Sequence, residues 1–147
     1  MVAVTVDGLR GVEPYLYYED GTAALDWLTR VLGFREVVRY LDENGAVAEA
    51  ELLAGSTRVH VAGGATAYWE KSGVQAPVGL ELIVVVEDVD AHHAATVAAG
   101  VEAEAPQDKP YAARTYAVRD PQGYSWTFWQ LLPADVELQP GWHEVRP

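Results

Sequence analysis

The sequence carries a weak internal repeat, which limits the folds open to the chain more than any other feature. The matching positions are Glu13 and Glu81, Glu19 and Glu87, Asp20 and Asp88, and Ala23 and Ala91 at an offset of 68 residues, with Gly33 and Gly100 and His60 and Thr127 at an offset of 67. Self-similarity at a fixed period is typical of duplicated structural units. We therefore expect two similar units related by a pseudo-twofold axis.

Each copy is predicted to contain one helix and four strands. In the first copy the patterns indicate strand 12–19, helix 23–32 and strands 35–41, 47–53 and 57–62. In the second copy they indicate strand 79–87, helix 88–99, strands 102–105 and 114–119, and a last strand after Gly123. The predicted fold class is α+β, with two β-α-β-β-β modules over about residues 12–62 and 79–131.

Three segments lie outside these modules. Residues 63–78 include three glycines and one proline, which favours a long connecting loop that serves as a lid or a partner contact. Residues 132–147 are expected to form a tail over the surface, and residues 1–11 a short arm or an extra edge strand. A chain of 147 residues is long enough for one complete core, so we expect residues 1–147 to form a single domain.

The second copy ends in a turn followed by an aromatic strand. Asp120, Pro121 and Gly123 suit the first, second and fourth positions of a turn. The alternation of a strand then gives two faces, with Ser125, Thr127 and Trp129 on one and Tyr124, Trp126 and Phe128 on the other. We expect one face to pack on helices and the other to line a cavity or a subunit contact.

The composition excludes several functional classes. A net charge of −12 without a cluster of Lys and Arg argues against nucleic-acid binding. The absence of cysteine excludes disulfides, Cys-ligated zinc and thiol catalysis. No apolar run has the length of a membrane span, and the first residues do not form a signal peptide, so the cytoplasm is the expected location. The acidic surface serves either solubility alone or the attraction of a cationic ligand.

Three segments carry a family resemblance: residues 24–34 (ALDWLTRVLGF), 86–91 (VEDVDA) and 114–124 (RTYAVRDPQGY). Together with the two-module order, they make residues 12–131 resemble the vicinal oxygen chelate superfamily. That superfamily includes glyoxalase I, extradiol dioxygenases, fosfomycin-resistance enzymes and bleomycin-resistance proteins. The resemblance implies two curved sheets that form a cup and a chain that pairs as a homodimer. It does not choose a reaction, because one fold hosts many chemistries.

The resemblance also implies positions for a divalent metal. In the metalloenzymes of the superfamily, the first and last strands of each module supply one ligand each, and those positions correspond here to Glu13, His60, Glu81 and Thr127. Three of the four suit Mn, Fe, Ni or Zn, whereas the neutral hydroxyl of Thr127 is a poor ligand. The alternative is a polar pocket without a metal, which the departure at Thr127 favours.

Glu81 is the most informative single residue and the candidate catalytic group. It interrupts residues 80–86, a strand that is otherwise apolar on both faces. A carboxylate in such a strand is paired, bound to a metal or exposed to a wet cavity. The structural alternative is an ion pair with Arg58 or Arg114. For His60 the alternative is a hydrogen-bonded pocket residue, and for Glu13 simple exposure.

Aromatic side chains exceed what a small core requires. Besides residues expected in the core, the surplus comprises Tyr15, Tyr17, Tyr68, Trp69, Tyr111, Tyr116, Trp126 and Trp129. Planar or cationic ligands stack on such rings, and core packing is the alternative for each. The ligand-binding candidates are therefore Glu13, Tyr15, His60, Trp69, Glu81, Arg114, Tyr116, Thr127 and Trp129. His92 and His93 lie side by side on a predicted helix and are expected to be mostly solvated.

Two functions follow from this sequence. The first is a metal-free small-molecule-binding protein, resembling bleomycin-resistance proteins, that sequesters a cationic or planar ligand such as an antibiotic. The second is a divalent-metal-dependent, glyoxalase-like lyase or isomerase, or a dioxygenase, that uses Glu13, His60 and Glu81. The sequence leaves open whether the protein is an enzyme and whether the modules pair within one chain or across two.

Overall fold

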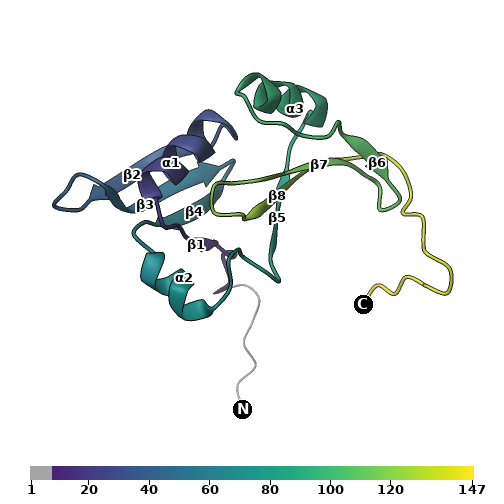
Figure 1. Ribbon diagram of the computed structural model, residues 1–147. Helices are drawn as coiled ribbons and strands as arrows, with labels where there is room; N and C mark the ends of the chain where they lie inside the picture. Colours follow the sequence, from purple (N-terminus) through teal and green to yellow (C-terminus); the bar gives the residue numbers. More distant parts are fainter. Residues whose placement is uncertain (1–7) are drawn as a thin grey trace, which may run out of the picture.

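The computed structural model describes residues 8–147 and contains two four-stranded sheets with the same strand order (Figure 1). Module 1 consists of β1 (Tyr15–Tyr17), α1 (Gly21–Arg30), β2 (Arg35–Leu41), β3 (Val47–Ala54) and β4 (Thr57–Ala62). Module 2 consists of β5 (Glu81–Val85), α3 (Val89–Ala98), β6 (Gln107–Lys109), β7 (Ala113–Arg119) and β8 (Ser125–Leu131). The sheet orders are β1-β4-β3-β2 and β5-β8-β7-β6, so the predicted α+β fold with two β-α-β-β-β modules is confirmed.

The registers of the two sheets reproduce the repeat in the sequence. In module 1, β1 pairs in parallel with β4 and places Tyr15 beside His60. In module 2, β5 pairs in parallel with β8 and places Ile83 beside Thr127. The equivalent residues of the repeat thus occupy equivalent positions in the two ladders.

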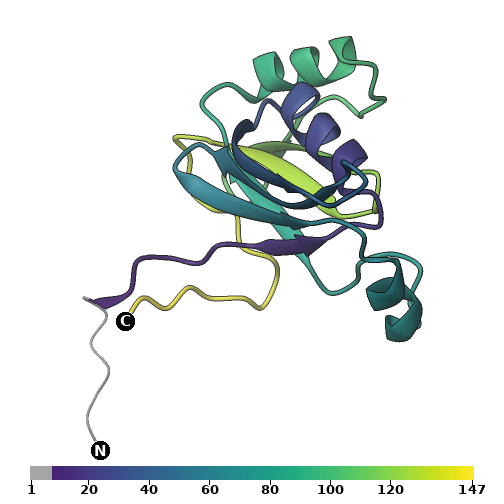
Figure 2. The same ribbon diagram turned by 90° about the vertical axis from the view of Figure 1, so that its left-hand side faces the viewer.

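The two long helices begin in the same way. The Asp20 side chain accepts a hydrogen bond from the Ala23 amide at 2.9 Å, and the Asp88 side chain accepts one from the Ala91 amide at 3.0 Å. Each aspartate thereby satisfies an amide that the first turn of its helix leaves unpaired. Both helices lie on the same side of the two sheets, next to one another (Figures 1 and 2).

One core joins the modules on this helix side. Its largest fully buried side chains come from both copies: Trp126, Tyr18, Phe128, Leu16, Leu25, Leu28, Leu52, Val59, Val61 and Val89. The Phe34 ring packs edge-on against the Trp126 ring with centroids 5.2 Å apart. The prediction that one face of the last strand packs on helices is confirmed, because Trp126 and Phe128 point into this core.

The sheets do not join into one closed cup within the chain. β1 and β5 are the edge strands of separate sheets, and the sheet faces turned away from the helices lie on the outside. The arm predicted at residues 1–11 falls largely outside the described residues, and only residues 8–14 of the segment before β1 can be followed.

Two sequence-based assignments were wrong. The predicted loop 63–78 contains a helix, α2 (Thr66–Ser72), which forms because one side chain, Trp69, is buried and anchors it. The strand predicted at 102–105 is irregular, and the short edge strand β6 follows it instead. The tight turn before β7 sets this register, since it pairs residues 107–109 with 113–115.

Candidate functional site

The side of the module 1 sheet that faces away from α1 carries polar and aromatic side chains. We call it the module 1 outer face: Glu13, Tyr15, Tyr17, Glu49, Glu51, Arg58 and His60. The strand register explains the set, because His60 lies between Tyr15 on β1 and Glu51 on β3, while alternate residues such as Leu16 and Val61 point into the core. This face carries three carboxylates, one guanidinium and one imidazole.

The polar groups of the module 1 outer face are linked to one another. His60 Nε2 lies 2.8 Å from a Glu13 carboxylate oxygen, and its Nδ1 lies 3.8 Å from Glu51. Glu51 also forms an ion pair with Arg58. The Tyr15 hydroxyl donates to Glu49 at 2.5 Å. This hydrogen bond raises the pKa of Tyr15 to about 12, helped by burial and by the negative charge of Glu49.

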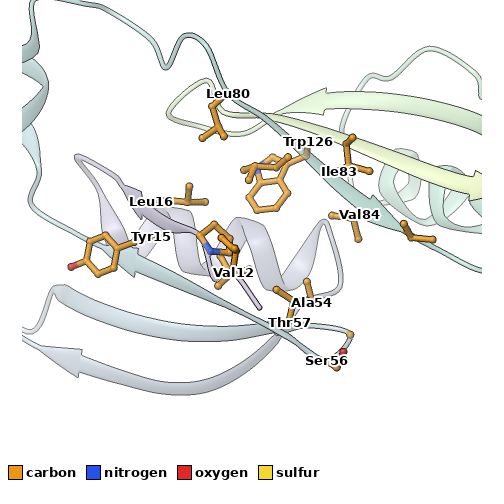
Figure 3. Close-up of a pocket in the computed structure, with 15 residues that line it drawn as sticks. Val12, Tyr15, Leu16, Ala54, Ser56, Thr57, Leu80, Ile83, Val84 and Trp126 are labelled. Atoms are coloured by element: carbon orange, nitrogen blue, oxygen red, sulfur yellow. The ribbon is translucent and has the colours of Figure 1, made fainter. Parts of the chain in front are cut away.

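An apolar groove of about 650 Å³ adjoins this face (Figure 3). It lies between the two edge strands, with β1 and the β3–β4 turn on one side and β5 on the other. The side chains around it are mostly apolar and include Val12, Leu16, Val59, Leu82, Val84 and Trp126. Tyr15 borders both the groove and the polar face, so the two regions adjoin at this ring.

The corresponding side of module 2 differs in character. We call it the module 2 outer face: Glu81, Ile83, Val85, Ser125, Thr127 and Trp129. The Thr127 hydroxyl donates to the Glu81 carboxylate, and the Trp129 ring stacks on Tyr111 with centroids 4.8 Å apart. Ile83 and Val85 leave 51% and 61% of their surface exposed, and Leu80 at the groove edge leaves 50%. Ile83, Val85 and Leu80 therefore form an uncovered apolar patch on and beside this face.

The four positions implied for a metal fall into two separate pairs. Glu13 and His60 meet on the module 1 outer face, whereas Glu81 and Thr127 meet on the module 2 outer face. Within residues 8–147, no group of three His, Asp or Glu side chains has the arrangement of a metal site. One copy of the chain therefore does not bring the three candidate ligands together.

Arg114 and Tyr116 lie on the α3 side of their sheet, away from both outer faces. Arg114 is held by Asp90 and Asp108, and its guanidinium hydrogen bonds hold the pKa of Asp90 below its usual value. Tyr116 is buried and bonded to His92 at 2.5 Å. The strand alternation that puts Thr115 on the outer side sends both residues toward the helix, so neither lines the groove.

Two further expectations were wrong. Glu81 pairs with neither arginine suggested for it, because Arg58 binds Glu51 and Arg114 binds the two aspartates. His92 is half-buried and stacks on Phe128, with centroids 4.1 Å apart, instead of being solvated. Burial lowers the pKa of His92. His92 lies on the side of α3 that faces the module 2 sheet. The pair of adjacent histidines in the sequence did not predict which of the two would face the sheet.

Trp69 is 9% exposed, and its indole nitrogen donates to the Tyr17 carbonyl at 3.1 Å. The sequence predicts a ligand contact for this residue. In the structure its buried indole anchors α2, and the residue also borders a cleft beside Tyr17. Conversely, Glu49 and Glu51 are not among the site residues that the sequence predicts. Their period-two spacing within a predicted strand, opposite the strand of His60, was the signal that could have identified them.

No helix of the described residues has the length and apolar character needed to cross a membrane. Comparison with curated protein sequences gives no significant match.

The chain matches one protein-family model and many solved structures. The family model described as "Glyoxalase/Bleomycin resistance protein/Dioxygenase superfamily" matches residues 9–128. TioX from Micromonospora sp. ML1 is 36% identical, covers 82% of this chain and 96% of its own, and superposes with a TM-score of 0.63. A glyoxalase/bleomycin resistance protein/dioxygenase from Nocardioides is 24% identical over 94% of this chain and 93% of its own, with a TM-score of 0.65.

A more distant neighbour shows how widely this fold is used. Lactoylglutathione lyase from Agrobacterium tumefaciens is 19% identical over 82% of this chain and 92% of its own, with a TM-score of 0.60. At that identity the similarity extends to the fold alone. Together, the match over residues 9–128 and the two-module architecture establish that the chain belongs to the glyoxalase/bleomycin resistance protein/dioxygenase superfamily.

Proposed function

We propose that this chain is a metal-free small-molecule-binding protein that takes up a planar, cationic ligand on the module 1 outer face and in the adjoining groove. The observation that carries the proposal is the combination of carboxylates and aromatic rings on one exposed surface. Glu49 and Glu51 lie on β3, on one side of the strand that carries His60, and Tyr15 lies on β1 on its other side. Tyrosine faces attract cations, and neighbouring carboxylates add to that attraction.

The groove supplies the apolar part of such a site. Binding pockets are mostly apolar with a few polar groups that orient the ligand, and a volume of about 650 Å³ lies in the range of ligand sites. A flat ring system would stack on the tyrosine rings of the module 1 outer face, place further apolar parts of the ligand in the groove and direct its charge toward the carboxylates. In this role the protein would act in the cytoplasm by sequestering its ligand, for example an antibiotic; the description of its family includes the words bleomycin resistance protein.

Calorimetric titration with three probes tests this proposal. 9-Aminoacridine is planar and cationic, 9-anthracenecarboxylate is planar and anionic, and tetramethylammonium is cationic without a ring. We expect saturable binding of 9-aminoacridine that is at least about tenfold tighter than that of either control, because only this probe satisfies both the rings and the charges. Equal affinity for all three probes, or no heat with any of them, would reject the proposal.

We further propose that the working form is a homodimer in which a second copy covers the module 2 outer face. Ile83 and Val85 form an exposed apolar surface, and soluble monomers seldom leave such patches open. The best partner is the module 1 outer face and groove of another copy, since β1 and β5 are both unpaired edge strands. Two such contacts related by a twofold axis would close two cups.

A divalent-metal-dependent enzyme remains the second candidate function. It is favoured by the equivalent placement of Glu13 with His60 in one module and Glu81 in the other. Only a second copy could unite these residues, and Thr127 would still leave the set one ligand short. Elemental analysis after incubation with Mn, Fe(II), Ni and Zn and desalting tests it. Retention of one metal per chain, lost in Glu81→Gln, would favour the enzyme over the metal-free binding protein.

A further inference from the structure

The Tyr17 ring of the module 1 outer face is covered by a side chain from outside that face. Tyr68 of α2 lies flat on it, with centroids 4.0 Å apart and planes only 9° from parallel. Tyr15 approaches the same ring edge-on at 5.2 Å. Tyr68 therefore occupies the position that a planar ligand would take if it stacked on Tyr17.

The rest of α2 is fixed independently of Tyr68. Trp69 is buried and bonded to the Tyr17 carbonyl, and the Ala65 amide donates to the Tyr18 carbonyl at 3.0 Å. These contacts hold the helix against the end of β1, while Figure 2 shows it standing apart from α1 and α3. The helix can therefore stay in place when the Tyr68 side chain moves.

Tyr68 itself is held weakly. It leaves 47% of its surface exposed, and among residues 8–147 its hydroxyl has no hydrogen-bond partner. A rotation about its own side-chain bonds would uncover Tyr17 without breaking a hydrogen bond. Beside the stacked pair lies a cleft of about 260 Å³ bordered by Tyr15, Val74 and Leu80, which leaves room for an incoming ring.

We propose that Tyr68 covers the Tyr17 platform in the empty protein and that a planar ring of the ligand displaces it. Tyr68 is then a specificity-determining residue that lowers the affinity for every planar ligand and rejects those that stack too weakly. This inference rests on the proposed binding function, whose ligand class it refines to one with a flat aromatic ring. The alternative is that Tyr68 remains in place and forms the second wall of a sandwich around the ligand.

The variant Tyr68→Ala separates these two arrangements. Calorimetric titration with 9-aminoacridine is compared for the wild type, for Tyr68→Ala and for Thr66→Ala, an exposed substitution on the same helix. If the ligand must displace the Tyr68 ring, its binding free energy is reduced by the stacking energy of the Tyr68–Tyr17 pair. We therefore expect Tyr68→Ala to bind about three- to tenfold more tightly than the wild type, with Thr66→Ala unchanged. Equal or weaker binding by Tyr68→Ala overturns the inference.

The same data distinguish this inference from the proposed function. If the wild type and Tyr68→Ala both fail to bind 9-aminoacridine, the binding function itself is rejected, and this inference with it. If the wild type binds and Tyr68→Ala shows no gain, only the covering role of Tyr68 is rejected. Thermal unfolding of Tyr68→Ala shows whether the fold is intact, and the exposed position on a helix favours this, since alanine is a better helix former than tyrosine.

Discussion

The outer faces of the two modules occupy equivalent positions in a duplicated scaffold, yet their chemistry differs. Where module 1 has Tyr15 beside His60, module 2 has Ile83 beside Thr127. The first face is a linked set of carboxylates, rings and basic groups, and the second exposes the aliphatic side chains of Ile83 and Val85 beside one polar pair. The backbone therefore has been kept while the two faces have diverged, one suited to polar recognition and the other to association.

The helix sides of the two sheets show the opposite behaviour. Leu16 in module 1 and Trp126 in module 2 meet in one core, so substitutions there affect both modules. The outer faces share no such constraint, since each is in contact with solvent. Residues of the outer faces can therefore change without disturbing the shared core, and each prediction below tests one part of this contrast.

The largest effect is expected at Asp120, which joins the modules. Its carboxylate accepts from the Tyr18 hydroxyl at 2.6 Å and from the Trp126 indole at 3.0 Å, and it also accepts three amides of its own turn. Asp120→Ala leaves these buried donors unpaired and should lower the free energy of unfolding by about 3–5 kcal/mol. Urea denaturation followed by tryptophan fluorescence measures the change.

Asp120→Asn is the matched control for this prediction. It keeps one oxygen that can accept hydrogen bonds, so the loss of stability should be clearly smaller than for alanine. If Asp120→Ala had the same free energy of unfolding as the wild type, the hydrogen bonds of Asp120 would not be needed to hold the two modules together.

The second effect tests the module 2 outer face as an association surface. Ile83→Lys should weaken dimerisation by about a hundredfold or more, because each copy loses roughly 1.5–3 kcal/mol of burial and a charge enters the contact. Val97→Lys on α3 is the matched control, since Val97 is 45% exposed but lies away from both outer faces. Sedimentation equilibrium should detect a monomer only for Ile83→Lys. A monomeric wild type would remove the proposed role of this face.

Much of the fold could be predicted from sequence because its determinants are local and occur twice. Asp20 and Asp88 mark two helix starts by direct capping, and alternation along residues 47–53 and 57–62 marks strands whose bounds the structure nearly reproduces. Residues 66–72 were missed because α2 depends on a tertiary contact. Nothing in its own short sequence outweighs the glycines on either side.

The site was harder to predict because it depends on which face of a strand is covered. The alternation of a strand places Arg114 and Tyr116 on one face and their sequence neighbours on the other. The sequence alone does not say which of these two faces packs against the helix. Glu13 and Glu81 were paired correctly by the repeat, and they still lie on separate faces, since the repeat does not fix how the two sheets join within one chain. The sequence pattern therefore predicts where a residue lies within its module. How the two modules are arranged depends on the side chains that pack between them in the core.

The third effect tests the acidic character of the module 1 outer face. Glu49→Gln should weaken binding of 9-aminoacridine by about three- to tenfold, because one carboxylate near the rings is worth roughly 1 kcal/mol to a cation at a partly exposed site. Glu87→Gln is the control, since it removes the same charge from an exposed position in the other module, after the end of β5. Equal weakening by both variants would mean that net charge, and not this face, attracts the ligand.

The same variant has a second, ligand-free readout. The Glu49 hydrogen bond is the main reason that the pKa of Tyr15 lies at about 12, so Glu49→Gln should bring this pKa down toward 10.0. Nuclear magnetic resonance of protein labelled at the tyrosine ring carbons follows the titration of this one residue. An unchanged Tyr15 pKa would contradict the contact between Tyr15 and Glu49.

The smallest effect lies behind the module 2 outer face, at His92. The neutral ring donates from Nε2 to the Leu32 carbonyl at 3.1 Å and accepts at Nδ1 from the Tyr116 hydroxyl. Burial lowers the pKa of His92 below 6.5, the value expected in the unfolded chain. The unfolded state therefore takes up a proton more readily, and stability that is fully present above pH 6.5 is lost as the pH falls from that value through the lower pKa of His92 in the folded protein.

Urea denaturation at pH 7.5 and pH 5.5 tests this pH dependence. The wild type should lose more of its free energy of unfolding on acidification than His92→Gln, which keeps hydrogen-bonding groups at the position but cannot take up the proton. Identical losses in the two proteins would assign the pH response to groups elsewhere. A smaller loss in His92→Gln would assign the pH response to His92, where α3 packs on the module 2 sheet. The acid sensitivity of the fold would then arise in the shared core and not on either outer face. Residues that stabilise the modules would thus be distinct from the outer-face residues that differ between them.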